Sequence, residues 1–585
     1  MRSKEISTLT IISLALLVHS VAVAFVSQTS FTAPTKSQTK CKDLETKTKT
    51  FCQNVGRHRC IRSSRTTLDA VTTKSDSDTA LISSTVQPNT IGNVVFWLPS
   101  GDNKNQKSKF GHNSPVGEPT IQEAAEHLCK KLFWCSDGRI SAQVYTMASN
   151  LELAKKANCL VAFHLSSPED LTVAEEVFLA RKQSQSSGIF EYPMSQFAIE
   201  CKSESLQSLV GSFDPANPSL VSQIFPWTTQ ASHRRLDEQI KSLFGRWTSD
   251  DFTTAILLYF QTCTPPTVNI PWVQYSIDAT WEKGPVRNAQ EFATMVSKCG
   301  DCITKCIADD TCLKCLNALT ELDTRDQVAS YRTIVSFESE LLRDFSLCIL
   351  QKNNVFQCQA TIPNMPYVPP ISKWRGKELT QADARQILIG HLNDDDASPV
   401  VPVDKRGPIS WKVACGANVA YDQFPSQNQI FYMNTKGKDM WYDPVFRVET
   451  IDGRNVWCKR HYKVRDGPNS GTFRFSVLDN GVTSNEFWTI AGVADDLSWI
   501  VFHYAGAASA VGQRYLGGLL CTADGSMPSP DQIPKAWAAL KLTGIEPWEL
   551  FVVNNDPDAP GIKEAGVAPL DFFRKHVMKL KQTTK

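Results

Sequence analysis

The segment TFRFSVLDNGVTSNEFWTI, residues 472–490, decides the architecture of the last third of the chain. Two strand-like runs, Thr472–Val477 and Phe487–Ile490, lie on either side of Asp479-Asn480-Gly481. Asn-Gly and Asp-Gly pairs between such runs are strong β-hairpin signals, because these residues tolerate the positive φ of a tight turn. The segment therefore predicts two antiparallel strands joined by a hairpin.

The same period of two begins at Ile409, and further turn signals occur at Asp452-Gly453 and Asp466-Gly467-Pro468. About eight short β-runs are predicted: Trp411–Ala414, Gln429–Met433, Val445–Thr450, Val456–Val464, Thr472–Val477, Phe487–Ile490, Trp499–Tyr504 and Gly517–Thr522. Eight meandering antiparallel strands close most naturally into an up-and-down barrel. Such a barrel can hold one small apolar ligand.

Composition excludes several classes of protein. The chain has 585 residues, a net charge of +1, 21% charged residues and 42% hydrophobic ones, which is typical of a globular protein rather than a disordered, collagen-like or coiled-coil one. Its length allows about three to four domains. The near-neutral balance argues against a nucleic-acid partner, because binding to phosphate needs a basic surplus.

The N-terminus carries targeting signals. Residues 1–24 have Arg2 and Lys4, then an apolar run, then Ala22-Val23-Ala24, which is typical of a secretory signal peptide. Residues 25–90 begin with a basic, Ser/Thr-rich stretch that has few acids and resembles a transit peptide or a disordered arm. No later run reaches the ~20 apolar residues of a membrane span, so we expect a soluble or peripheral mature protein.

Eight of the eighteen cysteines fall between Cys263 and Cys358. Those from Cys299 to Cys315 stand at helical spacings and are expected to line one side of a helical hairpin. The pattern C-x2-C-x9-C-x2-C resembles a zinc site, but its inner spacing is short and it contains no histidine. Because exported chains more often pair such cysteines, we expect disulfides and no metal. The disulfide candidates are Cys263, Cys299, Cys302, Cys306, Cys312, Cys315, Cys348 and Cys358.

The mature chain is predicted to be an α+β multidomain protein. Strand-like and helical runs alternate in a small α/β domain over residues 91–215, in which Thr120 and Glu123 have the spacing of a capping box. The other predicted parts are a helical Cys-rich domain over 235–360, a linker with one helix over 361–408, the eight-stranded barrel over 409–525, and a C-terminal helical tail over 526–585.

Four motifs carry a resemblance to a known family. They are KCIADDTC at 305–312, DFSLC at 344–348 with Cys358 after it, ISWKV at 409–413, and VFHYAG at 501–506. In this order, behind an export signal, they resemble the violaxanthin de-epoxidase family of plastid lipocalins. The resemblance covers roughly residues 295–525 and does not extend to the α/β part. The two-part N-terminus is similar to the presequences of algal complex plastids, which implies a chloroplast protein of the thylakoid lumen or stroma.

The resemblance implies an oxidoreductase of the xanthophyll cycle at the thylakoid membrane. It would remove the epoxide oxygen of a xanthophyll as water, with ascorbate as reductant. This chemistry needs an acid that protonates the oxygen while the C–O bond breaks. It also needs a dry channel long enough for a polyene. A carboxylic acid in an apolar barrel suits the first task, because desolvation raises its pKa.

The resemblance also implies the site residues. Asp422, Glu486 and Tyr504 are the candidate catalytic residues, and Gln427, His461, Trp411 and Trp488 are the candidate substrate-binding residues. Each has a structural alternative. Asp422 suits a loop cap, Glu486 and His461 suit solvated positions, and Tyr504 and the two tryptophans suit barrel packing.

Two functions therefore remain open. The first is a de-epoxidising plastid lipocalin with Glu486 or Asp422 as the acid. The second is a non-catalytic lipocalin of the same family that binds a carotenoid or lipid. An inward-facing carboxylate beside Tyr504 favours the first function, and an outward-facing Glu486 favours the second.

Overall fold

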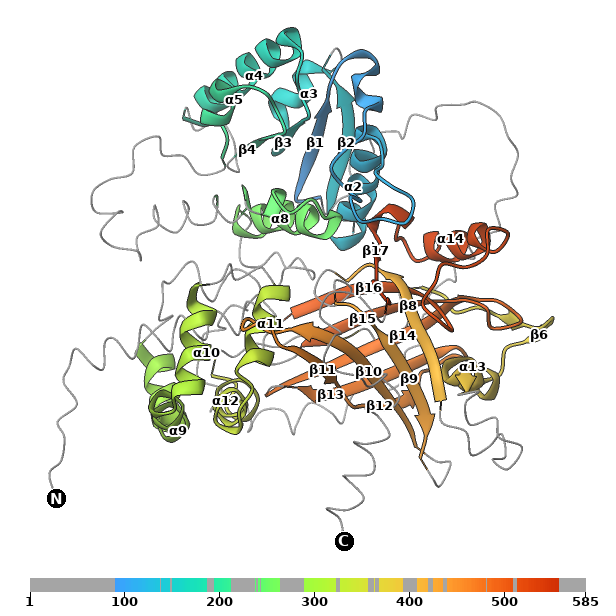
Figure 1. Cartoon of the computed structure of the whole chain (residues 1–585). Helices are drawn as coiled ribbons and strands as arrows, with labels where there is room; N and C mark the ends of the chain where they lie inside the picture. The colour runs from blue at the N-terminus through green and yellow to red at the C-terminus, as the bar shows by residue number, and fades with distance from the viewer. Residues whose placement is uncertain are drawn as a thin grey trace, which may run out of the picture. The chain divides into compact units, whose positions relative to one another are not determined.

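The computed structural model describes the parts of the chain that Figure 1 draws in colour. These are residues 90–136, 138–147, 150–186, 194–211, 237, 240–241, 243–263, 289–321, 327–355, 362, 368–392, 408–418, 424–434, 439–479, 481–508 and 513–556. The predicted signal peptide, nearly all of the predicted transit segment, Asp422, Cys358 and the side chain of Cys263 lie outside the described residues.

The first described part is a parallel four-stranded sheet of order β2-β1-β3-β4. Its strands are β1 (Gly92–Leu98), β2 (Ile140–Thr146), β3 (Cys159–Phe163) and β4 (Ser195–Ile199). Its helices are α2 (Ile121–Cys135), α3 (Leu151–Lys156), α4 (Pro168–Ser186) and α5 (Glu204–Ser208). Alternate residues of β1 belong to two different cores, one with α2 and one with α3 and α4, so helices cover both faces of the sheet. The predicted capping box starts α2, because Glu123 N–H donates to Thr120 Oγ1 at 3.1 Å.

The core of this sheet includes residues far along the chain. Helix α8 (Ser249–Cys263) contributes Phe252, Ile256 and neighbours to the cluster that holds α2, and Trp548 joins the same cluster. Within the region predicted to be helical from residue 235, the chain breaks at Trp247, whose φ is +56°. Thr248 Oγ1 then accepts a hydrogen bond from Asp251 N–H and begins α8.

The Cys-rich region is helical, as predicted. It contains α9 (Ala289–Ala308), α10 (Asp310–Glu321), α11 (Gln327–Ser336) and α12 (Glu340–Ser346), followed by a π-helical turn at Leu347–Lys352. Helix α11 does not continue into α12, because Ser339 Oγ accepts a hydrogen bond from Leu342 N–H and starts α12 anew.

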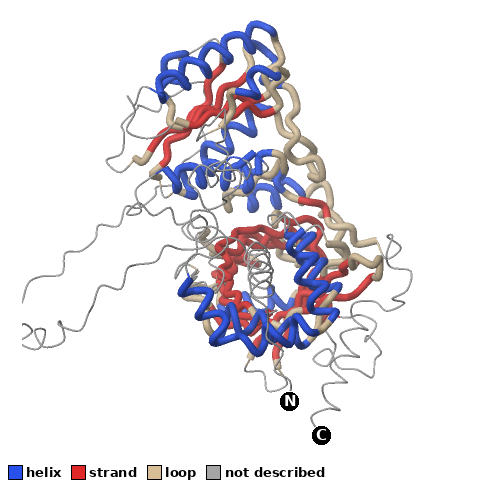
Figure 2. Tube along the Cα trace, turned by 90° about the vertical axis from the view of Figure 1, so that its left-hand side faces the viewer, coloured by secondary structure: helices blue, strands red, loops and turns tan. Residues whose placement is uncertain are grey.

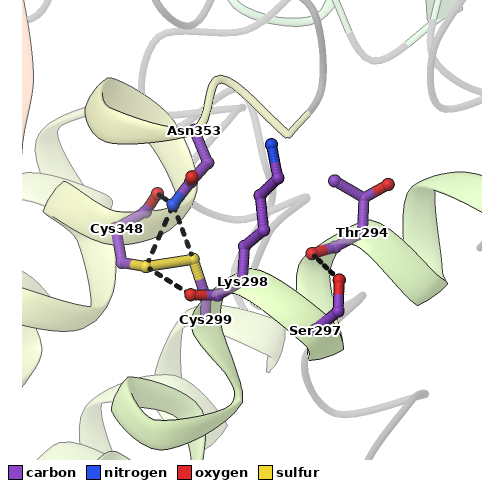
Figure 3. The surroundings of a disulfide bond; sticks show 6 residues. All are labelled: Thr294, Ser297, Lys298, Cys299, Cys348 and Asn353. Carbon is purple, nitrogen blue, oxygen red and sulfur yellow. Dashed lines mark hydrogen bonds between the residues drawn. A yellow bond between two sulfur atoms is a disulfide. The ribbon is translucent and has the colours of Figure 1, made fainter.

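Two disulfides brace these helices, which confirms the disulfide prediction for four of the eight candidates. Cys299–Cys348 joins α9 to the π-helical turn, and Cys306–Cys312 joins α9 to α10. The Asn353 side chain donates to both sulfurs of the first disulfide at 3.2 Å and to the Cys348 carbonyl at 2.9 Å (Figure 3). Cys302 and Cys315 remain thiols.

A short connecting region precedes the barrel. It consists of β5 (Lys373–Trp374), β6 (Lys377–Glu378), α13 (Gln381–Ile389) and β7 (His391–Leu392). Helix α13 begins with a capping box of Thr380 and Asp383 and ends at Gly390, whose φ is +60°. A methyl group at Gly390 would lie 2.5 Å from the indole nitrogen of Trp411, so glycine is needed for the close approach of α13 to the barrel.

Eight antiparallel strands form the predicted barrel, and they appear as a closed ring in Figure 2. They are β8 (Pro408–Gly416), β9 (Asn428–Met433), β10 (Met440–Glu449), β12 (Tyr462–Asp466), β13 (Thr472–Asp479), β14 (Val482–Val493), β15 (Ile500–Ala508) and β16 (Gln513–Thr522). Neighbours pair in sequence, and β8 closes the ring by pairing with both β16 and β9. The fold class is therefore the predicted one, with a lipocalin-like barrel.

One predicted strand is in fact two. The run Val456–Val464 turns at Arg460, whose N–H donates to the Pro444 carbonyl. Strand β11 (Asn455–Lys459) pairs with the end of β10, and β12 pairs with its beginning.

The chain leaves the barrel through α14 (Ile533–Lys541), a short 3-10 turn at Pro547–Glu549, and β17 (Phe551–Val552), which pairs with β8. None of the helices that the structure describes combines the length and the apolar character needed to cross a bilayer.

Candidate active site in the barrel

Glu486 lies inside the barrel, on β14, and is 7% exposed. Strand alternation decides this orientation, because Trp488, two residues further, also belongs to the interior core. The predicted solvated position of Glu486 is therefore not the one observed. A buried carboxyl group needs hydrogen-bond partners, since desolvation penalises an unpaired polar group.

Three side chains donate to this carboxyl group. Trp488 Nε1 lies 2.6 Å from Glu486 Oε2, and the Tyr515 hydroxyl lies 2.8 Å from Oε1. The Tyr462 hydroxyl lies further away, 3.5 Å from the same Oε1. Burial raises the pKa of Glu486 above its ordinary value, although the three hydrogen bonds oppose that shift. The group is thus suited to hold a proton at higher pH than an exposed glutamate.

Two glycine–tyrosine pairs across neighbouring strands shape this part of the barrel. Gly506 pairs with Tyr515, and Tyr504 pairs with Gly517. A methyl group at Gly506 would lie 2.1 Å from the Tyr515 ring, and one at Gly517 would lie 2.2 Å from the Tyr504 ring. Each ring therefore crosses over the glycine of the next strand. Since Gly506 also pairs with Glu486, this crossing brings the Tyr515 hydroxyl to the carboxyl group.

The predicted residues Trp488 and Tyr504 lie together in this interior. Their rings stack with centroids 5.1 Å apart and an interplanar angle of 20°. Both side chains line a small cavity beside Glu486, together with Gln427. Gln427 is buried, and its Nε2 donates to the Phe424 carbonyl at 3.0 Å. The structure therefore brings four of the seven candidate residues to one cavity.

The other candidates lie elsewhere. Trp411 is buried, and its Nε1 donates to the carbonyls of Ile387 and Leu388 in α13, which is a packing role. The side chain of His461 is 51% exposed, stacks on Trp441 and lies 2.6 Å from the buried Asp443, so the structure does not bring it to the cavity. Asp422 lies outside the described residues.

Several residues of the cavity were not predicted. Tyr515, Tyr462, Tyr442, Gln429 and Arg460 all line it. Gln429 on β9 and Tyr442 on β10 are diagonal neighbours across the two strands, and the tyrosine hydroxyl donates to the amide oxygen. The sequence did contain a signal for Tyr515. A tyrosine and a glycine stand two positions apart in both Tyr504–Gly506 and Tyr515–Gly517, so on paired strands each large residue can face a small one.

The cavity is small, about 50 Å³. We expected a channel long enough for a polyene, but pockets for drug-sized ligands measure roughly 300 to 1,000 Å³. Aromatic side chains fill the space instead: the rings of Phe431, Tyr442, Phe475, Trp488 and Phe502 contact one another in the middle of the barrel. In this conformation, the barrel does not hold a whole carotenoid.

A closed eight-stranded antiparallel barrel with a small internal cavity is the architecture of a lipocalin-type domain. Residues 291–555 match the family described as the VDE lipocalin domain. Residues 291–555 therefore form a VDE-related lipocalin domain. Among curated proteins, none matches the sequence.

Several solved structures are similar to part of the chain. Lobster apocrustacyanin A1 is 13% identical over 35% of this chain and 100% of its own, with a TM-score of 0.22. H1 crustacyanin from the lobster Homarus americanus is 11% identical over 36% of this chain and 100% of its own, with a TM-score of 0.20. The siderocalin Ex-FABP is 10% identical over 25% of this chain and 92% of its own, with a TM-score of 0.19. With TM-scores this low, the assignment depends on the family match.

Proposed function

We propose that the protein is an oxidoreductase that removes the epoxide oxygen of a xanthophyll, with ascorbate as reductant and Glu486 as the acid. The observation that carries this proposal is the inward-facing, buried Glu486, which lies two residue pairs along the β14–β15 ladder from the stacked Trp488 and Tyr504. A carboxylic acid that keeps its proton toward neutral pH can protonate an epoxide oxygen as the C–O bond breaks. The family match supports the same chemistry.

The proposed reaction balances with ascorbate as co-substrate. Both C–O bonds of the epoxide break, the two carbons form a double bond, and the oxygen leaves as water. Ascorbate supplies two electrons and two protons and becomes dehydroascorbate. Glu486 gives its proton to the epoxide oxygen and is reprotonated from the ascorbate hydroxyls or from water. Tyr504 and Gln427 line the same cavity and are proposed to orient the oxygen.

The substrate needs more room than the cavity offers. Arg460 lines the cavity and donates two hydrogen bonds. Its Nε lies 2.5 Å from Asp479 Oδ2, and its guanidinium group also donates to the hydroxyl of Tyr331 in α11. Tyr331 in turn packs on Phe446, another lining residue, with ring centroids 5.8 Å apart. We propose that these side chains move when the end ring of the pigment enters.

The alternative is a lipocalin of this family that binds a carotenoid or lipid without converting it. One observation favours it: among the described residues that line the cavity, Glu486 is the single carboxylate. A site of this kind could bind an oxygenated ring by hydrogen bonds and leave the epoxide intact.

One experiment separates the two functions. The mature protein is incubated with violaxanthin, ascorbate and galactolipid from mildly acidic to neutral pH, and the pigments are separated by chromatography. Glu486→Gln is the test variant, and pigment that co-purifies with each protein measures binding. Conversion by the wild type that is lost in Glu486→Gln while binding is retained would support the enzyme. Binding without conversion would support the carrier, and neither binding nor conversion would overturn both.

A further inference from the structure

A second cavity of about 370 Å³ lies outside the barrel. Helix α2, the residues before α8, strand β15 and the segment from Lys541 to Phe551 all contribute to its wall. Its volume is within the range of small-molecule pockets, and it is several times larger than the cavity beside Glu486. No residue of the proposed barrel site lines it.

Part of the lining of this cavity is an ionic cluster of Lys131, Asp250 and Glu549, with His127 beside it. Lys131 Nζ lies 2.6 Å from Asp250 Oδ1 and 2.9 Å from Glu549 Oε1. His127 Nε2 lies 3.0 Å from the other oxygen of Glu549, and Ser249 donates to the first. Because Lys131 and His127 outweigh the effect of burial, the pKa of Glu549 is held well below its ordinary value. Both carboxylates therefore already have a cation of the protein, Lys131, as a partner.

The lining also includes a buried imidazole, that of His503, whose Nε2 is without a hydrogen-bond partner. His503 lies on β15 between Phe502 and Tyr504, which face the barrel interior, so its side chain points out of the barrel toward the cavity. It is 2% exposed, and its Nε2 has no hydrogen-bond partner. Burial lowers the pKa of His503 to about 4, so the ring is neutral at neutral pH. A buried polar atom of this kind costs stability unless a ligand or water pairs with it.

The remaining lining suits a flat apolar molecule with a negative group. Trp134, Trp247 and Trp548 supply aromatic surface. At the rim, Lys541 lies 3.4 Å from Glu546, whereas the exposed Lys130 makes no ion pair within the described part of the chain. The lining groups without an ion pair or hydrogen bond in the described part of the chain thus include the imidazole Nε2 of His503 and the ammonium group of Lys130. Both can donate to an anion.

We propose that this cavity is a second binding site that takes a small aromatic molecule with an anionic group. The aromatic body would lie among the three tryptophans, His503 would donate to or accept from a polar atom of the ligand, and Lys130 would attract its charge. This site is independent of the proposed de-epoxidation, since it shares no residue with the barrel cavity.

The test uses the full chain and the fluorescent probe 1-anilinonaphthalene-8-sulfonate, an aromatic anion. Binding is followed by energy transfer from tryptophan to the probe. His503→Leu is expected to bind the probe about fivefold more weakly, the loss that one hydrogen bond accounts for. Its melting temperature should be unchanged or higher, because leucine replaces an unpartnered buried ring. His461→Leu, the same replacement at an exposed histidine directly before β12, should bind the probe like the wild type.

The contribution of the Lys130 charge to binding is tested by substitution, and because Lys130 is exposed we expect the variant to fold normally. Lys130→Gln should weaken binding of the sulfonate about twofold to fivefold and leave the neutral analogue N-phenyl-1-naphthylamine unaffected. Glu486→Gln should change neither probe. The proposal is overturned if the wild type does not bind the sulfonate, if His503→Leu and Lys130→Gln both bind it as the wild type does, or if Glu486→Gln alone abolishes binding.

Discussion

At the scale of single residues, Glu486 determines what the barrel can do. Its carboxyl group is buried against an indole and two phenols, and no cation is among the hydrogen-bond donors that the structure gives it. Burial without a countercharge raises the pKa of the carboxyl group, whereas a salt bridge would lower it. This difference distinguishes Glu486 from Glu549, which lies as deep but beside Lys131 and His127.

The raised pKa predicts how stability depends on pH. The folded protein holds the Glu486 proton more tightly than the unfolded chain, whose ordinary value is 4.5. Stability from this group is therefore complete below that value and falls as pH rises toward the folded pKa. Urea unfolding at several pH values should show a smaller decline for Glu486→Gln than for the wild type. Parallel pH profiles would contradict the assignment.

The two phenols give a matched pair of variants. Tyr515→Phe removes a hydroxyl 2.8 Å from Glu486, and Tyr462→Phe removes one at 3.5 Å from the same oxygen. We expect Tyr515→Phe to cost about 1 kcal/mol of unfolding free energy and Tyr462→Phe clearly less. Tyr515→Phe should also raise the pKa of Glu486 further, and with it the pH at which proposed activity declines. Equal effects of the two variants would argue against the observed geometry.

At the scale of elements, the two disulfides differ in how much chain they enclose. Cys299–Cys348 spans 49 residues, and Cys306–Cys312 spans 6. If a cross-link acts by restricting the unfolded chain, removing the first costs about 4 kcal/mol and removing the second about 2 kcal/mol. The paired variants Cys299→Ser with Cys348→Ser and Cys306→Ser with Cys312→Ser, compared by urea unfolding, test this order. A reversed order would show that strain or residual structure dominates.

Much of the barrel could be predicted from the sequence, because one face of each strand is apolar and hairpin turns carry Asp-Gly or Asn-Gly signals. The division between β11 and β12 could not, since no turn residue marks Arg460 and the break depends on how both pieces pair with β10. From the sequence, Glu486 could lie on either face of its strand, so its burial was one of two possible outcomes. Tyr515 was missed because its contact depends on the register of three strands across Gly506.

The filled interior could not be foreseen for a different reason. Aromatic residues at alternate positions predict an apolar core equally well whether they line an open tube or interdigitate across it. The difference depends on ring orientations that only coordinates give, such as the stacking of Phe431 on Tyr442 with centroids 4.7 Å apart.

At the scale of the whole molecule, Glu549 links the end of the chain to α2 and α8. Its low pKa means that its contribution to stability is present above its ordinary value of 4.5 and is lost as pH falls toward the folded value. Glu549→Gln should cost roughly 3 to 5 kcal/mol at neutral pH, because Lys131 loses a buried partner, and should be less sensitive to acid. Urea unfolding at neutral and acidic pH tests both effects.

A control lies three residues earlier. Glu546 pairs with Lys541 at 3.4 Å near the surface, and the side chain of that lysine is 57% exposed. Glu546→Gln should change stability by no more than about 1 kcal/mol. If both variants behave alike, the buried cluster does not contribute as its geometry indicates.

The participation of Trp548 in the core of the α/β sheet has a consequence for protein synthesis. Lys131 and Glu549 are 418 positions apart, so the ribosome makes the sheet and its helices long before the residues that complete them. While the ribosome translates the barrel, the hydrophobic surface of the sheet that Trp548 later covers would stay exposed to solvent and to chaperones. Truncated chains that end before Trp548 should therefore be bound by chaperones or degraded, even though they contain every strand of the sheet.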